Sequence, residues 1–475
     1  MEKLADLFDG LEEQSPQRVT AKQLSRLAAP AVDKAPTLLF TLAAAILIAT
    51  LTYGAYISLA IMSLKTDGAQ ISRTIAEGFA AGALTLDDYP EDTAHTPNQF
   101  NDCLVLFEAA SRGASTFKLA ISPLRADTSR NQCKTLHDAV TNPNSHTPAV
   151  FYHHYISGQT VFARLLLAIM PLKRAERFWT LAIVSLLFLG IAACMTDIVI
   201  GSDKPGAVAF LIVLFVFAGW YGLGSYGHSI AHAPSDLVLI GFVVFLALAH
   251  LNGGLQPKAA ILACAGFGAL SLIVELLTGG LPLGLCATIS LVPLALREDN
   301  PASLRRSAAH AGLSFISGAM TCVVLKIVLV GLVFGGQPLS SMEHGLGVRI
   351  GLAKSLTDAS PSSLFAVVKS ITDNMGVLYA GQREMALALL VIVVMAGAWA
   401  LYSARTRHAQ RSRTVIYLLG ASNLVLVAWV AAFSEHIFVH AFFMDRIFTW
   451  AAASGLAMFA LASFTDRPRL GYATQ

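Results

Sequence analysis

Charged side chains are scarce in this chain. Asp, Glu, Lys and Arg make up 13% of its 475 residues and hydrophobic residues make up 55%, whereas a soluble domain has about 25% charged residues. This shortage excludes an ordinary water-soluble protein, because no soluble core of this size needs so much apolar side chain. The net charge of +3 is small and scattered, which argues against a nucleic-acid partner.

A signal peptide, an internal repeat and a low-complexity tract are also missing. The first 35 residues are polar, and Leu4, Leu7, Phe8 and Leu11 predict only a short amphipathic helix on the cytoplasmic side. The first apolar run is too long for the core of a cleaved signal peptide. We therefore expect it to remain as a membrane span.

Long apolar runs are abundant instead. Roughly 20 apolar residues span the hydrocarbon of a bilayer, and windows of about 19 residues predict about ten spans. They lie near 36–63, 177–200, 206–225, 235–251, 258–277, 282–296, 308–334, 384–403, 413–433 and 441–463. We therefore expect an all-α, polytopic transmembrane helix bundle over 36–463. Its sixth span is short and contains a proline.

The positions of Lys and Arg predict the orientation, since cytoplasmic connections are enriched in both. The short turns at 226–234, 278–281 and 434–440 contain neither residue, so we place them outside. Both termini are then cytoplasmic, as segments 1–35 and 464–475. Against this pattern, three basic residues stand at the outer mouth of the second span, namely Lys173, Arg174 and Arg177.

Two longer segments fall outside in this arrangement, 64–176 and 335–383. Neither is patterned like an independent domain. The second holds an apolar stretch, Leu364 to Ile371, that suits a helix lying in the membrane interface.

Two cations lie at membrane depth, Lys326 in the seventh span and Arg446 in the tenth. A charge there costs about 2.5–3.5 kcal/mol on insertion scales, so each needs a partner. One interpretation is a structural ion pair with Glu275 or Asp445. The other, which we favour, is a cavity in which both cations hold the phosphate of a lipid-linked substrate.

Histidines gather on the predicted outer side. His228/His232 and His436/His440 have the i, i+4 spacing that places two imidazoles on one helix face, a spacing that can bind zinc. No His-Glu-x-x-His motif is present, however. We therefore expect no metal site, and the open alternatives are hydrogen bonds to backbone or headgroups and a role in function.

Asp102 begins an apolar segment in the first outer loop. A helix N-cap is one interpretation, and a general base whose pKa is raised by apolar surroundings is the other. The acidic run of Asp87, Asp88, Glu91 and Asp92 suits a solvated loop face, with a bound divalent cation as the alternative. No other cofactor is expected.

Six cysteines are present, of which Cys194, Cys264, Cys286 and Cys322 fall within spans as small apolar residues. Cys103 and Cys133 share the first outer loop, where an oxidising compartment permits a disulfide. Their pairing is a hypothesis.

This layout resembles the GT-C glycosyltransferases, which use polyprenyl-phosphate-linked sugars. The chain shares their plan of one span, a long outer loop with an acidic residue, and a series of short-looped spans. Local patches are also similar to a weakly characterised bacterial membrane-protein family. They are Asn101–Leu104, Tyr152–Gly158 with Arg164, Leu277–Pro282, Phe315–Gly318 through Lys326, and Glu435–His440 with Phe443 and Arg446.

The resemblance implies an enzyme of the bacterial inner membrane whose site faces the periplasm. Asp102 would be the general base of an inverting sugar transfer to a glycan, lipid or protein acceptor, and the 335–383 segment would close over the site. The donor phosphate would be held by residues drawn from Tyr152, His153, His154, Tyr155, Lys326, Arg349, His436, His440 and Arg446.

Three rival functions remain. A lipid or polysaccharide flippase also needs intramembrane cations, but it predicts polar residues on both sides of the midplane, and here they crowd one side. A surface acyltransferase would use a histidine base, for which His153 and His154 are the candidates. A non-catalytic partner of an envelope polysaccharide machine is the third.

Overall fold

The computed structural model consists mainly of helices. It describes residues 36–89, 99–127, 131–142, 147–201, 203–221, 229–277, 279–298, 300–350, 363–374, 383–407, 410–440 and 444–464. Met1–Pro36 and Thr37–Gln475 are separate units, and only the second is described below. The predicted N-terminal helix, the C-terminal tail, His228, Glu91 and Asp92 lie outside the described residues.

Seven helices in the described part of the chain are long and apolar enough to cross a membrane. They are α2 (Leu38–Ser63), α8 (Leu172–Ile200), α10 (Ala233–Leu251), α11 (Pro257–Val274), α13 (Pro301–Phe334), α16 (Arg383–Arg407) and α17 (Gln410–Ala432). Three shorter apolar helices occupy the third, sixth and tenth predicted spans: α9 (Lys204–Tyr221), α12 (Gly280–Ala295) and α20 (Phe448–Phe464). The prediction of a polytopic helical membrane protein is confirmed, and the count of ten stays a prediction.

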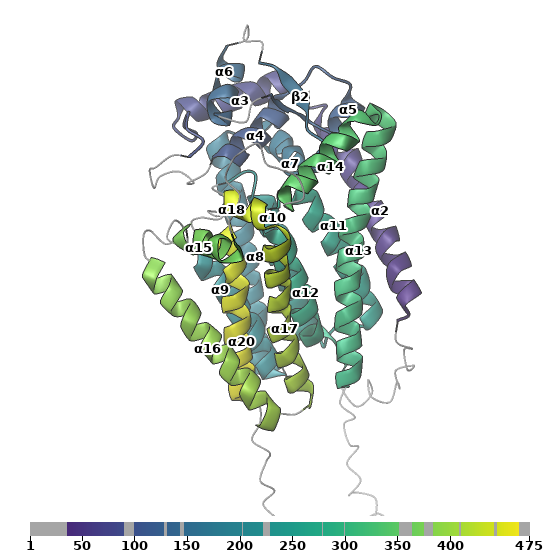
Figure 1. Ribbon diagram of the computed structural model, residues 1–475, viewed down its shortest axis with the longest axis vertical. Helices are drawn as coiled ribbons and strands as arrows, with labels where there is room; N and C mark the ends of the chain where they lie inside the picture. The colour runs from purple at the N-terminus through teal and green to yellow at the C-terminus, as the bar shows by residue number, and fades with distance from the viewer. Residues whose placement is uncertain are drawn as a thin grey trace, which may run out of the picture. The chain divides into compact units, whose positions relative to one another are not determined.

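The first outer loop folds over one end of this bundle, which we call the capped end (Figure 1). Its elements are α3 (Gly68–Ala80), α4 (Phe100–Ala110), α5 (Thr116–Ile121), α6 (Gln132–Thr141) and α7 (Gly158–Leu167), with the antiparallel strands β1 (Leu124–Ala126) and β2 (Ala149–Phe151). Buried side chains of α3, α4, α6 and α7 belong to the same hydrophobic core as the bundle, and Ala120 of α5 belongs to a second cluster with residues of α2, α11 and α13. The loop is therefore part of the bundle rather than a separate domain.

The second predicted outer segment contributes two helices near the same end. After α13 the chain reverses at Gly335, whose φ of 82° suits glycine, and enters α14 (Gln337–Arg349). Further on, α15 (Leu364–Asn374) packs against α18 (Ser434–Val439), which precedes the short 3₁₀ helix η2 (Asp445–Ile447). The helix predicted from the Leu364–Ile371 stretch is present as α15.

A carboxylate from another part of the loop caps the N-terminus of helix α6. Asp88 accepts the backbone N–H of Gln132 (3.0 Å) and of Cys133 (2.8 Å), which satisfies two donors that a helix start leaves open. Asp88 is buried, so its assignment to a solvated loop face is wrong. The sequence interpretation failed because the capped helix lies more than forty residues away.

A disulfide joins Cys103 on α4 to Cys133 on α6, which confirms the hypothesis of pairing. Cys194, Cys264, Cys286 and Cys322 are free and buried, as expected for small apolar residues in spans. The cross-link closes a loop with a sequence separation of 30 residues.

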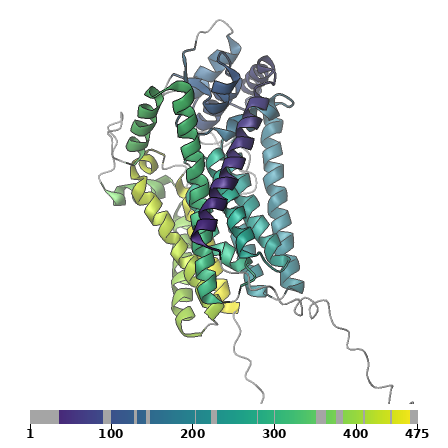
Figure 2. The ribbon, with the colours of Figure 1, turned by 90° about the vertical axis from the view of Figure 1, so that its right-hand side faces the viewer.

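Helices α11 and α13 approach each other closely in the bundle core. A Cβ on Gly268 would meet the backbone of Phe315, and a Cβ on Gly318 would meet that of Ala265. Small residues let membrane helices approach at backbone distance, and α2 lies along the outside of this pair (Figures 1 and 2). Ser314 adds a hydrogen bond to the Ile261 carbonyl at 2.8 Å.

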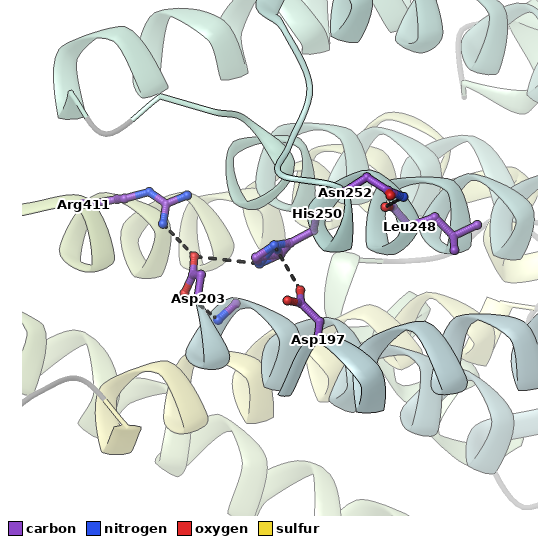
Figure 3. A network of polar contacts seen from close by, with 7 residues as sticks. Asp197, Asp203, Leu248, His250, Asn252 and Arg411 are labelled. Atoms are coloured by element: carbon purple, nitrogen blue, oxygen red, sulfur yellow. Dashed lines mark hydrogen bonds and ion pairs between the residues drawn. The ribbon is translucent and has the colours of Figure 1, made fainter. Parts of the chain in front are cut away.

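A polar cluster ties four helices together at the end of the bundle opposite the cap (Figure 3). His250 of α10 lies 3.4 Å from Asp197 of α8 and 3.8 Å from Asp203, which precedes α9. Arg411 of α17 binds the same Asp203 carboxylate at 2.6 Å. We name this set the far-end cluster.

Substitution of Gly206, in the first turn of α9, tests how tightly the far-end cluster is packed. A Cβ there would meet the His250 imidazole, so Gly206→Ala should lower the melting temperature by several degrees, as expected for about 1–3 kcal/mol of overpacking. Gly219→Ala on the same helix is the control, because nothing lies within 4 Å of its Cβ. Equal melting temperatures for the two variants in detergent would contradict this packing.

Removal of the disulfide should destabilise the cap. Closing a loop of about 30 residues is worth roughly 3–4 kcal/mol in the chain-entropy model, so the double variant Cys103→Ser/Cys133→Ser should unfold at a lower temperature. In the wild type, alkylation of denatured protein without reductant should leave both residues unmodified. Two added alkyl groups at these positions would disprove the cross-link.

Candidate functional site

A cavity of about 610 Å³ lies at the capped end. Its walls come from the ends of α11, α13 and α17, from one face of α14, and from the segment after β2. Most of the lining is apolar, and the ionisable side chains that line it are His154, Glu275, Lys326, Glu343 and Arg349. An apolar pocket with a few convergent polar groups is the usual form of a small-molecule site.

Lys326 of α13 lines the cavity, and the cap binds its ammonium group. Its ammonium group donates to the Ile121 carbonyl and to the Ser122 hydroxyl, the latter at 3.0 Å. The Ser122 hydroxyl also lies 2.8 Å from His153 Nδ1. The predicted position of Lys326 in a cavity is confirmed, and its buried side chain is held by the end of α5.

Arg349 closes the cavity from the last turn of α14. Its guanidinium lies 5.0 Å from the Tyr155 ring centroid, within cation–π distance. His154 donates from Nε2 to the Ser341 carbonyl at 3.2 Å, so it fastens α14 to the segment after β2. No residue of α14 is buried, and these two contacts add to its packing against α13 and α18.

Glu275 is the C-cap of α11 and opens a turn that contains a residue with positive φ. It is buried and accepts the Ser235 hydroxyl at 2.6 Å. Leu277 follows with φ 61°, a region that bulky residues rarely adopt and that marks strain at functional sites. His436 donates from Nε2 to the Leu277 carbonyl at 3.2 Å and supports the turn. Glu275 and Leu277 both line the cavity.

Arg446 does not reach this cavity as predicted. It forms an ion pair with Asp236, near the start of α10, and the cavity lining does not include it. The ion pair of the alternative interpretation is therefore present, but its partner is Asp236 rather than Glu275 or Asp445. The reason is topological, because α10 and η2 are distant in the chain and meet only through packing.

Asp102 is also absent from the cavity lining. One of its oxygens accepts the Ser229 hydroxyl at 2.7 Å and the Ala231 backbone N–H at 2.9 Å. Its neighbour Asn101 donates to His232 Nε2 at 3.2 Å. Burial raises the pKa of the Asp102 carboxyl to about 7, although the bonds from Ala231 and Ser229 oppose the rise. Asp102 therefore holds the turn that precedes α10 and does not cap its own helix, α4.

The remaining predicted residues differ in their relation to the cavity. Tyr155 lines it, whereas Tyr152 carries the Arg125 guanidinium 4.7 Å above its ring and His153 contacts Ser122. The rings of His436 and His440 lie 4.6 Å apart.

Burial is the main cause of lowered pKa values among these histidines. The pKa falls to about 3 for His436 and to about 4 for His440, His153 and His154. These lowered pKa values favour the neutral imidazole in the ligand-free protein.

A second buried carboxylate escaped the sequence interpretation. Glu108 of α4 accepts the Thr160 hydroxyl at 2.5 Å, and its backbone carbonyl accepts from Arg164 at 3.1 Å. Burial raises the pKa of Glu108 to about 7, opposed by the Thr160 bond and the Arg164 charge. The sequence does carry a signal for Glu108, because it is the one acid within the apolar segment Cys103–Ala110.

Two cavity carboxylates were also missed as site residues. The sequence suggested Glu275 only as an ion-pair partner for a buried cation. No nearby residue in the sequence marked Glu343 as functional. Among the side chains that the structure describes, no group of three or more His, Cys, Asp or Glu is arranged to hold a metal ion.

Apolar side chains form much of the cavity wall on α13. Met320 and Ile327 line the cavity, one above the other on this helix, and are 52% and 41% exposed. The same space is lined by two cations, Lys326 and Arg349, and by two acids, Glu275 and Glu343. The cavity thus combines an apolar wall with ionisable groups of both signs.

The far-end cluster contradicts the expectation that polar residues crowd one side of the membrane midplane. Asp236 and His250 lie 14 residues apart on α10, which is about 20 Å at 1.5 Å per residue. Polar groups therefore occur at both ends of the bundle. Only those at the capped end line the cavity.

Comparisons of this chain with family models, with curated proteins and with solved structures found no match.

The raised pKa of Asp102 predicts a pH-dependent stability. The folded state holds this proton up to about pH 7 and the unfolded chain releases it near 3.9, so rising pH favours unfolding between these values. As pH rises from 5 to 8, the melting temperature of the wild type should fall relative to that of Asp102→Asn. The exposed Asp127→Asn should follow the wild type, and a pH-independent gap for Asp102→Asn would contradict the prediction.

Proposed function

We propose that this protein is a membrane glycosyltransferase that takes a sugar from a polyprenyl-phosphate carrier. The observation that carries the proposal is the cavity, which combines apolar walls with the cations Lys326 and Arg349. A lipid-linked phosphosugar has the same division into a long apolar tail and an anionic head. The acceptor would be a glycan, a lipid or a protein segment.

The two cations suit the leaving group of such a transfer. Negative charge grows on the carrier phosphate as the sugar–phosphate bond breaks, and preorganised cations in a dry site stabilise it most. Arg349 offers a planar fork and Lys326 a point charge. Both are already held by protein contacts, so little reorganisation is needed when the donor binds.

The capped end would face the exterior or the periplasm. The Cys103–Cys133 disulfide suits an oxidising compartment, and the Arg405–Arg413 cluster lies toward the other end, where Lys and Arg favour the cytoplasm. The chain would accordingly act in the bacterial inner membrane, with both termini in the cytoplasm.

Sugar transfer is favoured over lipid flipping by the contents of the cavity. A flippase requires a path through the bundle, whereas the ionisable lining residues lie at one end and include the carboxylates Glu275 and Glu343. The far-end cluster is taken up by contacts among helices and does not line the cavity.

Activity should be measured with the purified full-length chain in proteoliposomes. A panel of radiolabelled polyprenyl-phosphate sugars, supplied with envelope lipid and glycan acceptors, should yield labelled product and free polyprenyl phosphate. Movement of the intact labelled donor between leaflets without product would support the flippase instead. Binding with neither outcome would favour an assembly partner.

Loss of the cavity guanidinium should weaken donor binding. A hydrogen bond to a charged group is worth about 1.5–3 kcal/mol, so Arg349→Gln should raise the donor Kd by roughly 10- to 100-fold, and Lys326→Met should act in the same direction. Arg306→Gln is the control, because Arg306 is an exposed cation on α13 about 30 Å from Lys326 at 1.5 Å per residue. Unchanged donor affinity in Arg349→Gln would remove the assigned phosphate site.

A further inference from the structure

We propose that Glu275 is the group that accepts the proton of the attacking hydroxyl, an inference that rests on the proposed function. The expectation from resemblance placed this role on Asp102, but the cavity lining contains Glu275 and not Asp102. The assignment stands on position, burial and the contacts that orient the carboxylate.

Glu275 is the cavity carboxylate that the protein holds in place. Its side chain is 3% exposed, and Ser235 donates to Oε2 at 2.6 Å. Glu343, the other cavity-lining acid, is exposed on a helix with no buried residue. A catalytic carboxylate must be positioned within a fraction of an ångström by its supporting contacts, which favours Glu275.

The turn after α11 is shaped around this carboxylate. A Cβ at Gly280 would meet Glu275 Oε2 and would lie 2.7 Å from Ser235 Oγ, so only glycine leaves the pair undisturbed. Leu277, with its φ of 61°, turns the chain within the cavity wall. Strain of this kind persists where surrounding structure holds it, and it clusters at active sites.

The cations of the cavity complete the arrangement. Glu275 lines the same space as Lys326 and Arg349, so a bound phosphosugar would have its phosphate near the cations and its sugar within reach of the carboxylate. Asp236, the residue after Ser235, forms the ion pair with Arg446.

The proposed step balances without a co-reactant. The acceptor oxygen forms a bond to the anomeric carbon of the sugar while the bond between that carbon and the phosphate oxygen breaks. The bonding electron pair leaves with the polyprenyl phosphate, whose charge Lys326 and Arg349 meet. The acceptor proton passes to the Glu275 carboxylate and then to water.

Asp102 would be a positioning residue in this scheme. It fixes the turn at Ser229 and Ala231, from which α10 starts, and Ser235 lies in the first turn of that helix. Its contribution would reach the reaction through the hydroxyl that orients Glu275.

The test compares Glu275→Gln with the wild type in the proteoliposome transfer assay. The amide keeps the shape and can still accept from Ser235, but it cannot take a proton. We expect kcat to fall by about 10²- to 10⁴-fold, the usual contribution of a general base, with the donor Kd and the melting temperature unchanged. Glu384→Gln, an exposed acid at the start of α16, is the control.

Two further variants keep the inference testable if Glu275→Gln fails to fold. Ser235→Ala leaves the carboxylate but removes its donor, and should lower kcat roughly tenfold at unchanged KM. Gly280→Ala should displace the carboxylate with a larger loss, whereas Gly54→Ala, with nothing within 4 Å of its Cβ, should remain active.

The outcomes separate the two proposals. A wild type that transfers sugar, together with an active Glu275→Gln or with full kcat in both Ser235→Ala and Gly280→Ala, would overturn the role of Glu275 and leave the proposed function standing. Loss of kcat in Glu343→Gln or Asp102→Asn rather than Glu275→Gln would also overturn it. A wild type that releases no polyprenyl phosphate from any donor would overturn both.

Discussion

The close approach of α11 and α13 is the constraint on which the cavity depends. Gly268 and Gly318 remove the side chains that would otherwise separate the two backbones, and dispersion contacts replace lipid along this seam. Glu275 follows Gly268 by seven residues and Lys326 follows Gly318 by eight. At 1.5 Å per residue both functional groups stand about 10–12 Å beyond the contact, at a similar height in the bundle. The seam thus determines that an acid and a cation line one space.

Buried charge is balanced across helices rather than within them. Arg446 binds Asp236 of α10, Lys326 binds the end of α5, and Arg411 binds Asp203 ahead of α9. An uncompensated charge inside a protein is strongly destabilising, so each contact favours one arrangement of the helices it joins. Contacts between distant segments also hold the cap together. Asp88 accepts backbone N–H groups in the first turn of α6, and the Cys103–Cys133 disulfide ties α6 to α4. Lys326 and Arg349 also line the cavity.

Prediction from the sequence succeeded where the signal was local. The positions of the apolar helices, the amphipathic α15 and the cysteine pair were all anticipated, because each depends on composition or spacing within a short segment or one loop. The prediction failed where two residues have similar sequence surroundings but contact different partners in the folded protein. Lys326 and Arg446 are both cations near the outer ends of apolar helices, yet one lines the cavity and the other forms an ion pair. Asp102 and Glu275 differ in a similar way, since Glu275 lines the cavity whereas Asp102 holds the turn that precedes α10.

The sequence by itself determined that this is a helical membrane protein, because lipid offers no hydrogen bonds and each apolar run must satisfy its backbone internally. It also determined which residues are costly enough to require a partner. Only the tertiary structure decided which partner each one has, since Ser235 meets Glu275 and Asp236 meets Arg446 across separations of 40 and 210 residues. Such contacts follow from how side chains of several helices fill space together, a property that no single segment contains.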